Sequence, residues 1–128
     1  MNLDELSGAE LLRRVFSYIP TTDKIDLFDI SLNRDGEVLI ANFDLVDQLP
    51  DRPPEKWKNF NRCRLGIYCA VVSDLNLVGW GARNISSLSI DKSEGGYDVK
   101  ISGESVRIKF LCKFISLVGP TVYLDEGC

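Results

Sequence analysis

The sequence predicts a mainly β fold, on the border with α+β: an antiparallel sheet or sandwich of about seven to eight strands preceded by one helix. Apolar and polar residues alternate over much of residues 25–124, which is typical of strands with one buried and one wet face. Turn-forming sequences separate these runs. A helical period is confined to about residues 3–18. The 128 residues suit a single domain spanning 1–128.

The N-terminal helix is predicted from apolar residues that recur near the 3.6-residue period, namely Leu3, Leu6, Leu11, Leu12, Val15 and Phe16. Acidic residues at its start and Arg13 and Arg14 near its end suit the helix dipole. Pro20 is expected to end the segment.

The first two strands, about 25–33 and 37–45, are expected to form a hairpin around the turn Asn33–Gly36. On the first strand, Phe28, Ile30 and Leu32 alternate with polar residues and are predicted to share the apolar face. On the second strand that face is formed by Leu39, Ala41, Phe43 and Leu45.

Residues 46–60 contain three prolines and are predicted to form a surface loop with at most one short turn at about 55–58. Further strands are expected at 63–70, 73–78, 85–91, 97–101 and 106–112, and residues 114–118 extend the last or add one more. In the strand at 73–78, Leu75 and Leu77 are predicted to face the core.

The absence of histidine removes whole classes of site. Without an imidazole there is no Ser-His-Asp or Cys-His nucleophile system and no His-ligated metal. The four cysteines show no CxxC spacing, so Cys63, Cys69 and Cys112 are predicted to be buried apolar residues and Cys128 an exposed thiol. We therefore expect no metal, no cofactor and no enzymatic activity, although carboxylate catalysis stays open as an alternative.

Charge is distributed unevenly along the chain. Residues 1–51 hold eleven acidic and four basic side chains, a net of −7, and the remainder holds eight acidic and eleven basic, a net of +3. An acidic portion favours a cationic protein partner over nucleic acid. It could also be no more than a solubilising surface. We predict an acidic rim that contacts a partner, formed by Asp44, Asp47, Asp51 and Glu55.

Trp57, Trp80 and Arg83 are further candidates for partner contacts, because Trp and Arg often dominate binding energy at protein interfaces. Each tryptophan could instead serve structure, Trp57 by fixing its loop to the sheet edge and Trp80 as a core anchor. The run Lys56–Arg64 interleaves cations with aromatics and could stack bases, but the acids around it would repel phosphate.

Two motifs carry a resemblance to a known family. They are P-x-x-P-P-x-K-W at Pro50–Trp57 and L-x-L-x-G-W at Leu75–Trp80. With the hairpin before them, they resemble the bacterial immunity protein 50 family over about residues 25–110. Similar sequences often carry a His-Asp pair before the first strand, whereas residues 21–26 here contain no histidine.

The resemblance implies a non-enzymatic immunity protein that binds and neutralises a cognate toxin of a polymorphic toxin system. The alternative is a small-ligand or carbohydrate-binding β-domain that uses exposed tryptophans. The N-terminus lacks the features of a signal peptide, and the longest uncharged stretch is too short to cross a membrane, so we expect a cytoplasmic protein. The toxin, its activity and the oligomeric state stay open.

Overall fold

The computed structural model describes residues 1–126 and confirms the mainly β prediction. Cys128, predicted as an exposed thiol, lies outside the described residues. The elements, in chain order, are η1 (Leu3–Glu5), α1 (Glu10–Val15), β1 (Ile25–Asn33), β2 (Val38–Leu45), β3 (Arg62–Ala70), β4 (Ser73–Val78), β5 (Ile85–Ser93), β6 (Gly96–Gly103), β7 (Arg107–Cys112) and β8 (Phe114–Tyr123). The loop predicted between the second and third strands is present.

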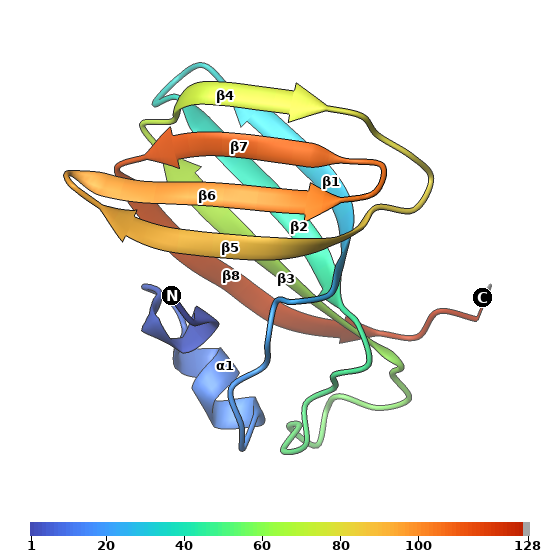
Figure 1. The fold of residues 1–128 in the computed structure, drawn as a ribbon. Coiled ribbons are helices and arrows are strands. Elements are labelled where there is room, and N and C mark those ends of the chain that lie inside the picture. The colour runs from blue at the N-terminus through green and yellow to red at the C-terminus, as the bar shows by residue number, and fades with distance from the viewer. Residues whose placement is uncertain (127–128) are drawn as a thin grey trace.

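The eight strands form one antiparallel sheet in the order β4-β7-β6-β5-β1-β2-β3-β8. The sheet narrows at its centre, because β1 and β5 pair only through Ile25 with Ser86 and Asp26 with Ile85. On either side of this narrow pairing, four strands form a layer, and Figure 1 shows the two layers facing each other with their strands crossing. The single sheet is therefore folded at this pairing, so that its two halves pack face to face as the two layers of a β-sandwich do.

The core lies between these two layers. Alternate residues of β2, β3, β6 and β7 are buried, as the pleat of a strand requires. The inward face predicted for β2 is confirmed, and so is the burial of Cys63, Cys69 and Cys112. The largest fully buried side chains, Phe43 and Phe110, come from one layer each.

The prediction of one helix over about residues 3–18 is wrong. The segment is split into η1 and α1 because the chain between them pairs with the edge of β8, where the Leu117 N–H donates to the Ser7 carbonyl at 2.7 Å. Gly8 adopts a positive φ of 85°, and a Cβ there would approach the Leu117 carbonyl oxygen to 2.6 Å. Edge pairing therefore outweighs the helical periodicity of this segment.

The predicted face of β1 is also wrong in part. The register between β1 and β2 shifts between Leu27 and Asp29, so the strand carries a bulge at Phe28. Before the bulge Ile25 and Leu27 point into the core, and Phe28 is 56% exposed. A period-two pattern read straight through the strand cannot detect the extra residue.

Two smaller differences concern the sheet edges. Leu77 on β4 lies opposite the buried Ile108 but is exposed, since β4 is an edge strand, whereas Leu75 packs against the core. β8 runs on through Gly119 and Pro120, which fall where the β3 register shifts between Arg64 and Gly66. A proline is tolerated there because β8 is the other edge strand and the position lies in an irregularity.

Candidate functional site

Two acidic side chains lie side by side on the outer face of the layer formed by β1, β2, β3 and β8. The hairpin register places Asp26 of β1 directly opposite Asp44 of β2. Like charges in cross-strand pairs repel, so each carboxylate needs a cation. Asp44 pairs with Arg64 of the neighbouring β3, and Asp26 pairs with Arg83 from the loop before β5.

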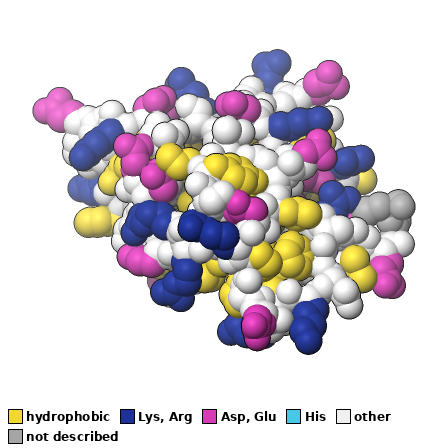
Figure 2. Space-filling view, turned by 90° about the horizontal axis from the view of Figure 1, so that it is seen from below, with side chains coloured by type: hydrophobic (Ala, Val, Ile, Leu, Met, Phe, Trp, Pro, Cys, Tyr) yellow, Lys and Arg dark blue, Asp and Glu magenta, His cyan; other side chains and the backbone are white. Residues whose placement is uncertain are grey.

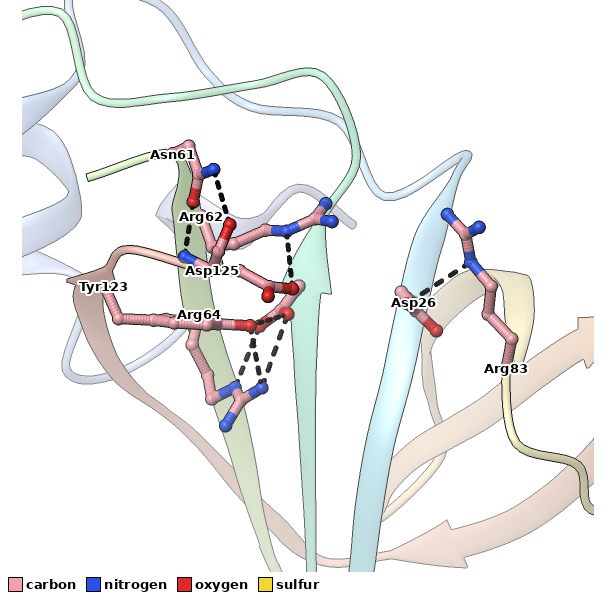
Figure 3. A network of polar contacts seen from close by, with 8 residues as sticks. Asp26, Asn61, Arg62, Arg64, Arg83, Tyr123 and Asp125 are labelled. Atoms are coloured by element: carbon pink, nitrogen blue, oxygen red, sulfur yellow. Dashed lines mark hydrogen bonds and ion pairs between the residues drawn. The ribbon is translucent and has the colours of Figure 1, made fainter. Parts of the chain in front are cut away.

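Asp44 is the centre of a hydrogen-bond network across three strands. Arg64 donates from Nε to Asp44 Oδ1 at 2.8 Å and from Nη2 to Oδ2 at 3.3 Å, which is the bidentate geometry of a strong ion pair. The hydroxyl of Tyr123 on β8 donates to Oδ2 of the same carboxylate and accepts from Arg64 Nη2 at 3.1 Å. Figure 3 shows Arg64 and Tyr123 converging on this point from β3 and β8.

The network raises the pKa of two of its members, Tyr123 and Arg64. Burial and the hydrogen bond to Asp44 raise the pKa of Tyr123 to about 12. Burial lowers the pKa of the Arg64 guanidinium, but the hydrogen bond and charge of Asp44 raise it by more, so the net pKa is raised. The three side chains hold one another in a fixed arrangement, in which Asp44 is only 7% exposed.

The guanidinium of Arg64 also stacks on an aromatic ring. Its central carbon lies 3.8 Å from the centroid of the Phe28 ring and 4.9 Å from that of Tyr123. Both distances are within the range of cation–π attraction. The bulge of β1 places Phe28 where Arg64 can hold it, so an exposed aromatic side chain is fixed on the outer face.

Trp80 approaches the same place from the loop between β4 and β5. Gly79 turns the chain with a φ of 77°, and Asn84 then fixes the loop. The Oδ1 atom of Asn84 accepts from the Gly81 N–H at 2.8 Å, and its Nδ2 donates to the Gly81 carbonyl at 3.0 Å. The Trp80 side chain remains 49% exposed.

An open cavity of about 290 Å³ lies between these parts. It is lined by Asp26, Leu27, Phe28, Asp44, Trp80, Gly81, Ala82 and Asn84. Two aromatic side chains and two carboxylates therefore line one hollow, with Arg83 at its margin, 3.9 Å from Asp26. The arrangement offers apolar area together with the weakly paired carboxylate of Asp26.

The structure separates the predicted acidic rim. Asp44 is nearly buried in the network above, so it does not form an exposed rim with the other three acids. Asp51 accepts hydrogen bonds from the hydroxyl and the backbone N–H of Ser17, and these two bonds lower its pKa. Asp47 and Glu55 are exposed on the loop between β2 and β3.

The uneven charge of the chain is mixed by folding. Acidic β1 and β2 lie beside β3, and their carboxylates meet cations from the later part of the sequence, as in Asp44 with Arg64 and Asp26 with Arg83. Figure 2 shows another face, seen from below, on which acidic and basic side chains are interspersed with small apolar patches. Among residues 1–126, the acidic side chains on that face do not form a single surface, despite the net charge of −7 over residues 1–51.

The two tryptophans have different environments. Trp57 is half-buried and packs against the core, and its backbone N–H donates to the Pro54 carbonyl at 2.9 Å. The loop around it is anchored by Arg52, whose guanidinium donates to the Phe16 carbonyl at 2.6 Å. Trp57 is thus part of the packing between its loop and the core, whereas Trp80 lines the cavity with Asp44.

Sequence reasoning missed Phe28, Arg64, Tyr123 and Asp26 as parts of this site. One signal was available, because the turn at Asn33–Gly36 fixes a hairpin register from which the pairing of Asp26 with Asp44 could be counted. The bulge shifts that count by one residue, so the pairing cannot be read reliably without it.

Within residues 1–126, no helix is long and apolar enough to cross a membrane. The same residues contain no group of three or more His, Cys, Asp or Glu side chains that could hold a metal ion.

Comparison with known proteins identifies a family. The model of the family described as Immunity protein 50 matches residues 8–123 of the 128-residue chain, which includes both motifs that carried the resemblance. The resemblance is confirmed. No curated protein and no solved structure matches the chain.

Proposed function

The chain belongs to the immunity protein 50 family, and we propose that it binds a cognate protein toxin and neutralises it by occupying the toxin's surface. The toxin belongs to a polymorphic toxin system, and the encounter takes place in the cytoplasm of the cell that makes both proteins. The family match over residues 8–123 is the observation that carries the proposal.

The outer face of β1, β2, β3 and β8 supports a binding role. A tight inhibitor needs a rigid surface, because ordering side chains on association costs free energy. Arg64, Asp44 and Tyr123 hold one another in place, and Arg64 in turn holds Phe28. The face therefore presents exposed side chains whose geometry is set before a partner arrives.

Neutralisation by binding requires no chemistry from the inhibitor, and we propose that the protein is not an enzyme. The carboxylates nearest the cavity favour this reading. Asp44 is held by an arginine and a tyrosine, and Asp26 accepts from the Asn84 N–H at 3.3 Å. These contacts suit charge balance and positioning of the loop.

Co-expression with the toxin encoded beside the gene tests the proposal. The chain should restore growth of cells that express the toxin and should co-elute with it in gel filtration as a complex of defined stoichiometry. A catalytically inactive toxin variant allows the complex to be purified without selection. Growth that is not restored, together with separate elution of the two proteins, would contradict the proposal for that toxin.

A further inference from the structure

We propose that the cavity between Phe28 and Trp80 is the receptor for a basic side chain, an arginine or a lysine, of the toxin. The inference rests on the proposed function and goes beyond it by naming the place of contact and the chemistry of the contacting group. It follows from three properties of the cavity: its aromatic walls, its charge and its surroundings.

The walls suit a flat or extended cation. Phe28 is 56% exposed although Arg64 covers part of its ring, and Trp80 is 49% exposed on a loop fixed by Asn84. Cations bind over aromatic faces, best over tryptophan, and the interaction strengthens when water is excluded. The volume of about 290 Å³ admits one long side chain of a partner.

The weakly paired carboxylate of Asp26 makes the cavity favour a cation over an anion. Asp44 is neutralised by its ion pair with Arg64 and also accepts from Tyr123, so the charge that a partner meets comes from Asp26. Asp26 is held less firmly, because the nearest cation, Arg83 Nε, lies 3.9 Å away and the Arg83 side chain is 71% exposed. A partner's guanidinium could reach Asp26 within hydrogen-bond distance and leave Arg83 to swing into solvent.

The surroundings suit a protein rather than a small solute. The outer face continues from the cavity along the same strands, where the register places Ile40, Tyr68, Val118 and Phe114 on the outward side. Tyr68, Val118 and Phe114 are exposed. Protein interfaces combine an apolar core with an enrichment of aromatic residues and arginine, and this exposed area beside the cavity fits that composition.

Affinity for the toxin encoded beside the gene tests the assignment. Asp26→Asn, Phe28→Ala and Trp80→Ala should each weaken binding by about tenfold or more, as removal of a central interface contact does. Asp35→Asn in the first hairpin turn and Leu32→Ala at the far end of β1 are matched controls and should bind within about twofold of the original chain. Circular dichroism spectra and melting temperatures would establish that each variant is folded.

The outcomes separate the two proposals. If the original chain binds the toxin and all three cavity variants bind equally well, the cavity assignment is overturned and the proposed function stands. If the original chain does not bind the toxin, the proposed function fails for that pair. The assignment of the cavity is then tested by a measurement that does not require the toxin.

That measurement is a titration with arginine amide, followed by the indole N–H signal of Trp80 in NMR spectra. Trp80→Ala assigns the signal, because only Trp57 remains in that variant. Arginine amide should shift it saturably, whereas citrulline amide, its uncharged analogue, should not, and Asp26→Asn should abolish the shift. Equal shifts with both compounds, or none with either, would overturn the assignment.

Discussion

The guanidinium carbon of Arg64 lies 3.8 Å from the centre of the Phe28 ring, so a side chain of β3 is stacked on one of β1 across the intervening β2. Between them on β2 is Asp44, which fixes the guanidinium through two hydrogen bonds. One arginine therefore neutralises a nearly buried carboxylate and orients an exposed aromatic ring. Substitutions at Arg64 should affect both stability and the shape of the outer face.

Arg64→Met should lower the free energy of unfolding by about 2–4 kcal/mol, because Asp44 would be left nearly buried without its cation. Urea denaturation measures the change. Lys100→Met, on an exposed position of β6, is the control and should change stability by less than about 0.5 kcal/mol. Equal effects of the two substitutions would show that the Arg64 ion pair contributes nothing beyond a surface charge.

Phe28→Ala should cost less than about 1 kcal/mol, whereas Phe43→Ala should cost about 3–5 kcal/mol, as deletion of a buried aromatic does. The two residues lie on paired strands, but Phe28 is exposed at a bulge and Phe43 is fully buried. Denaturant midpoints compare them directly. A large loss of stability for Phe28→Ala would instead indicate that Phe28 is buried in the core, as the sequence pattern predicts.

Most strands of this fold could be predicted from the sequence, because alternation and turn residues act locally. The alternation places the inward residues of β2, Leu39, Ala41, Phe43 and Leu45, correctly. The errors arise where a distant partner decides the local structure. The bulge at Phe28 depends on pairing with β2, and the break in the N-terminal helix depends on the hydrogen bond between Leu117 and Ser7.

The candidate site was less predictable for a physical reason. Charge counted along the chain indicated an acidic region, but strand order brings Arg64 beside Asp44 and Arg83 beside Asp26. Pairing between segments that are far apart in sequence is set by sheet topology, which composition does not contain. Trp80 was identified because its residue type favours interfaces, and its neighbours at the cavity emerged only from the fold.

The glycine before Trp80 should be essential to the loop that carries it. Gly79 and Gly95 both have positive φ values, 77° and 79°, but a Cβ at Gly79 would lie 1.9 Å from the Ser105 carbonyl oxygen, whereas one at Gly95 meets nothing within 4 Å. Gly95→Ala should cost about 1 kcal/mol from backbone strain alone. Gly79→Ala should cost more than about 3 kcal/mol because the backbone must also move. Thermal unfolding of both variants separates the cost of the steric clash at Gly79 from the cost of backbone strain, which both positions share.

Truncation of the two tryptophans should change stability by different amounts. Trp57→Ala should lower stability by about 2–3 kcal/mol, since the ring packs against the core and fixes the loop between β2 and β3. Trp80→Ala should change stability by less than about 1 kcal/mol, since half of the side chain is exposed. Chemical denaturation gives both values. If Trp80→Ala unfolds the protein, the ring is a structural anchor and its exposure has no functional meaning.

The bond between Asp51 and Ser17 should make stability depend on pH in the acid range. The hydroxyl and backbone N–H of Ser17 lower the pKa of Asp51 below its ordinary value of 3.8. A lowered pKa in the folded state means that the stabilisation is complete above pH 3.8 and is lost as pH falls through the folded-state pKa. Asp51→Asn removes this titration. The variant should therefore be less stable than the original chain at pH 6, and the two proteins should become equally stable in strong acid. Urea denaturation of both proteins at a series of pH values measures the difference. A constant difference across the series would mean that Asp51 stabilises the Ser17 segment through contacts that do not depend on its charge.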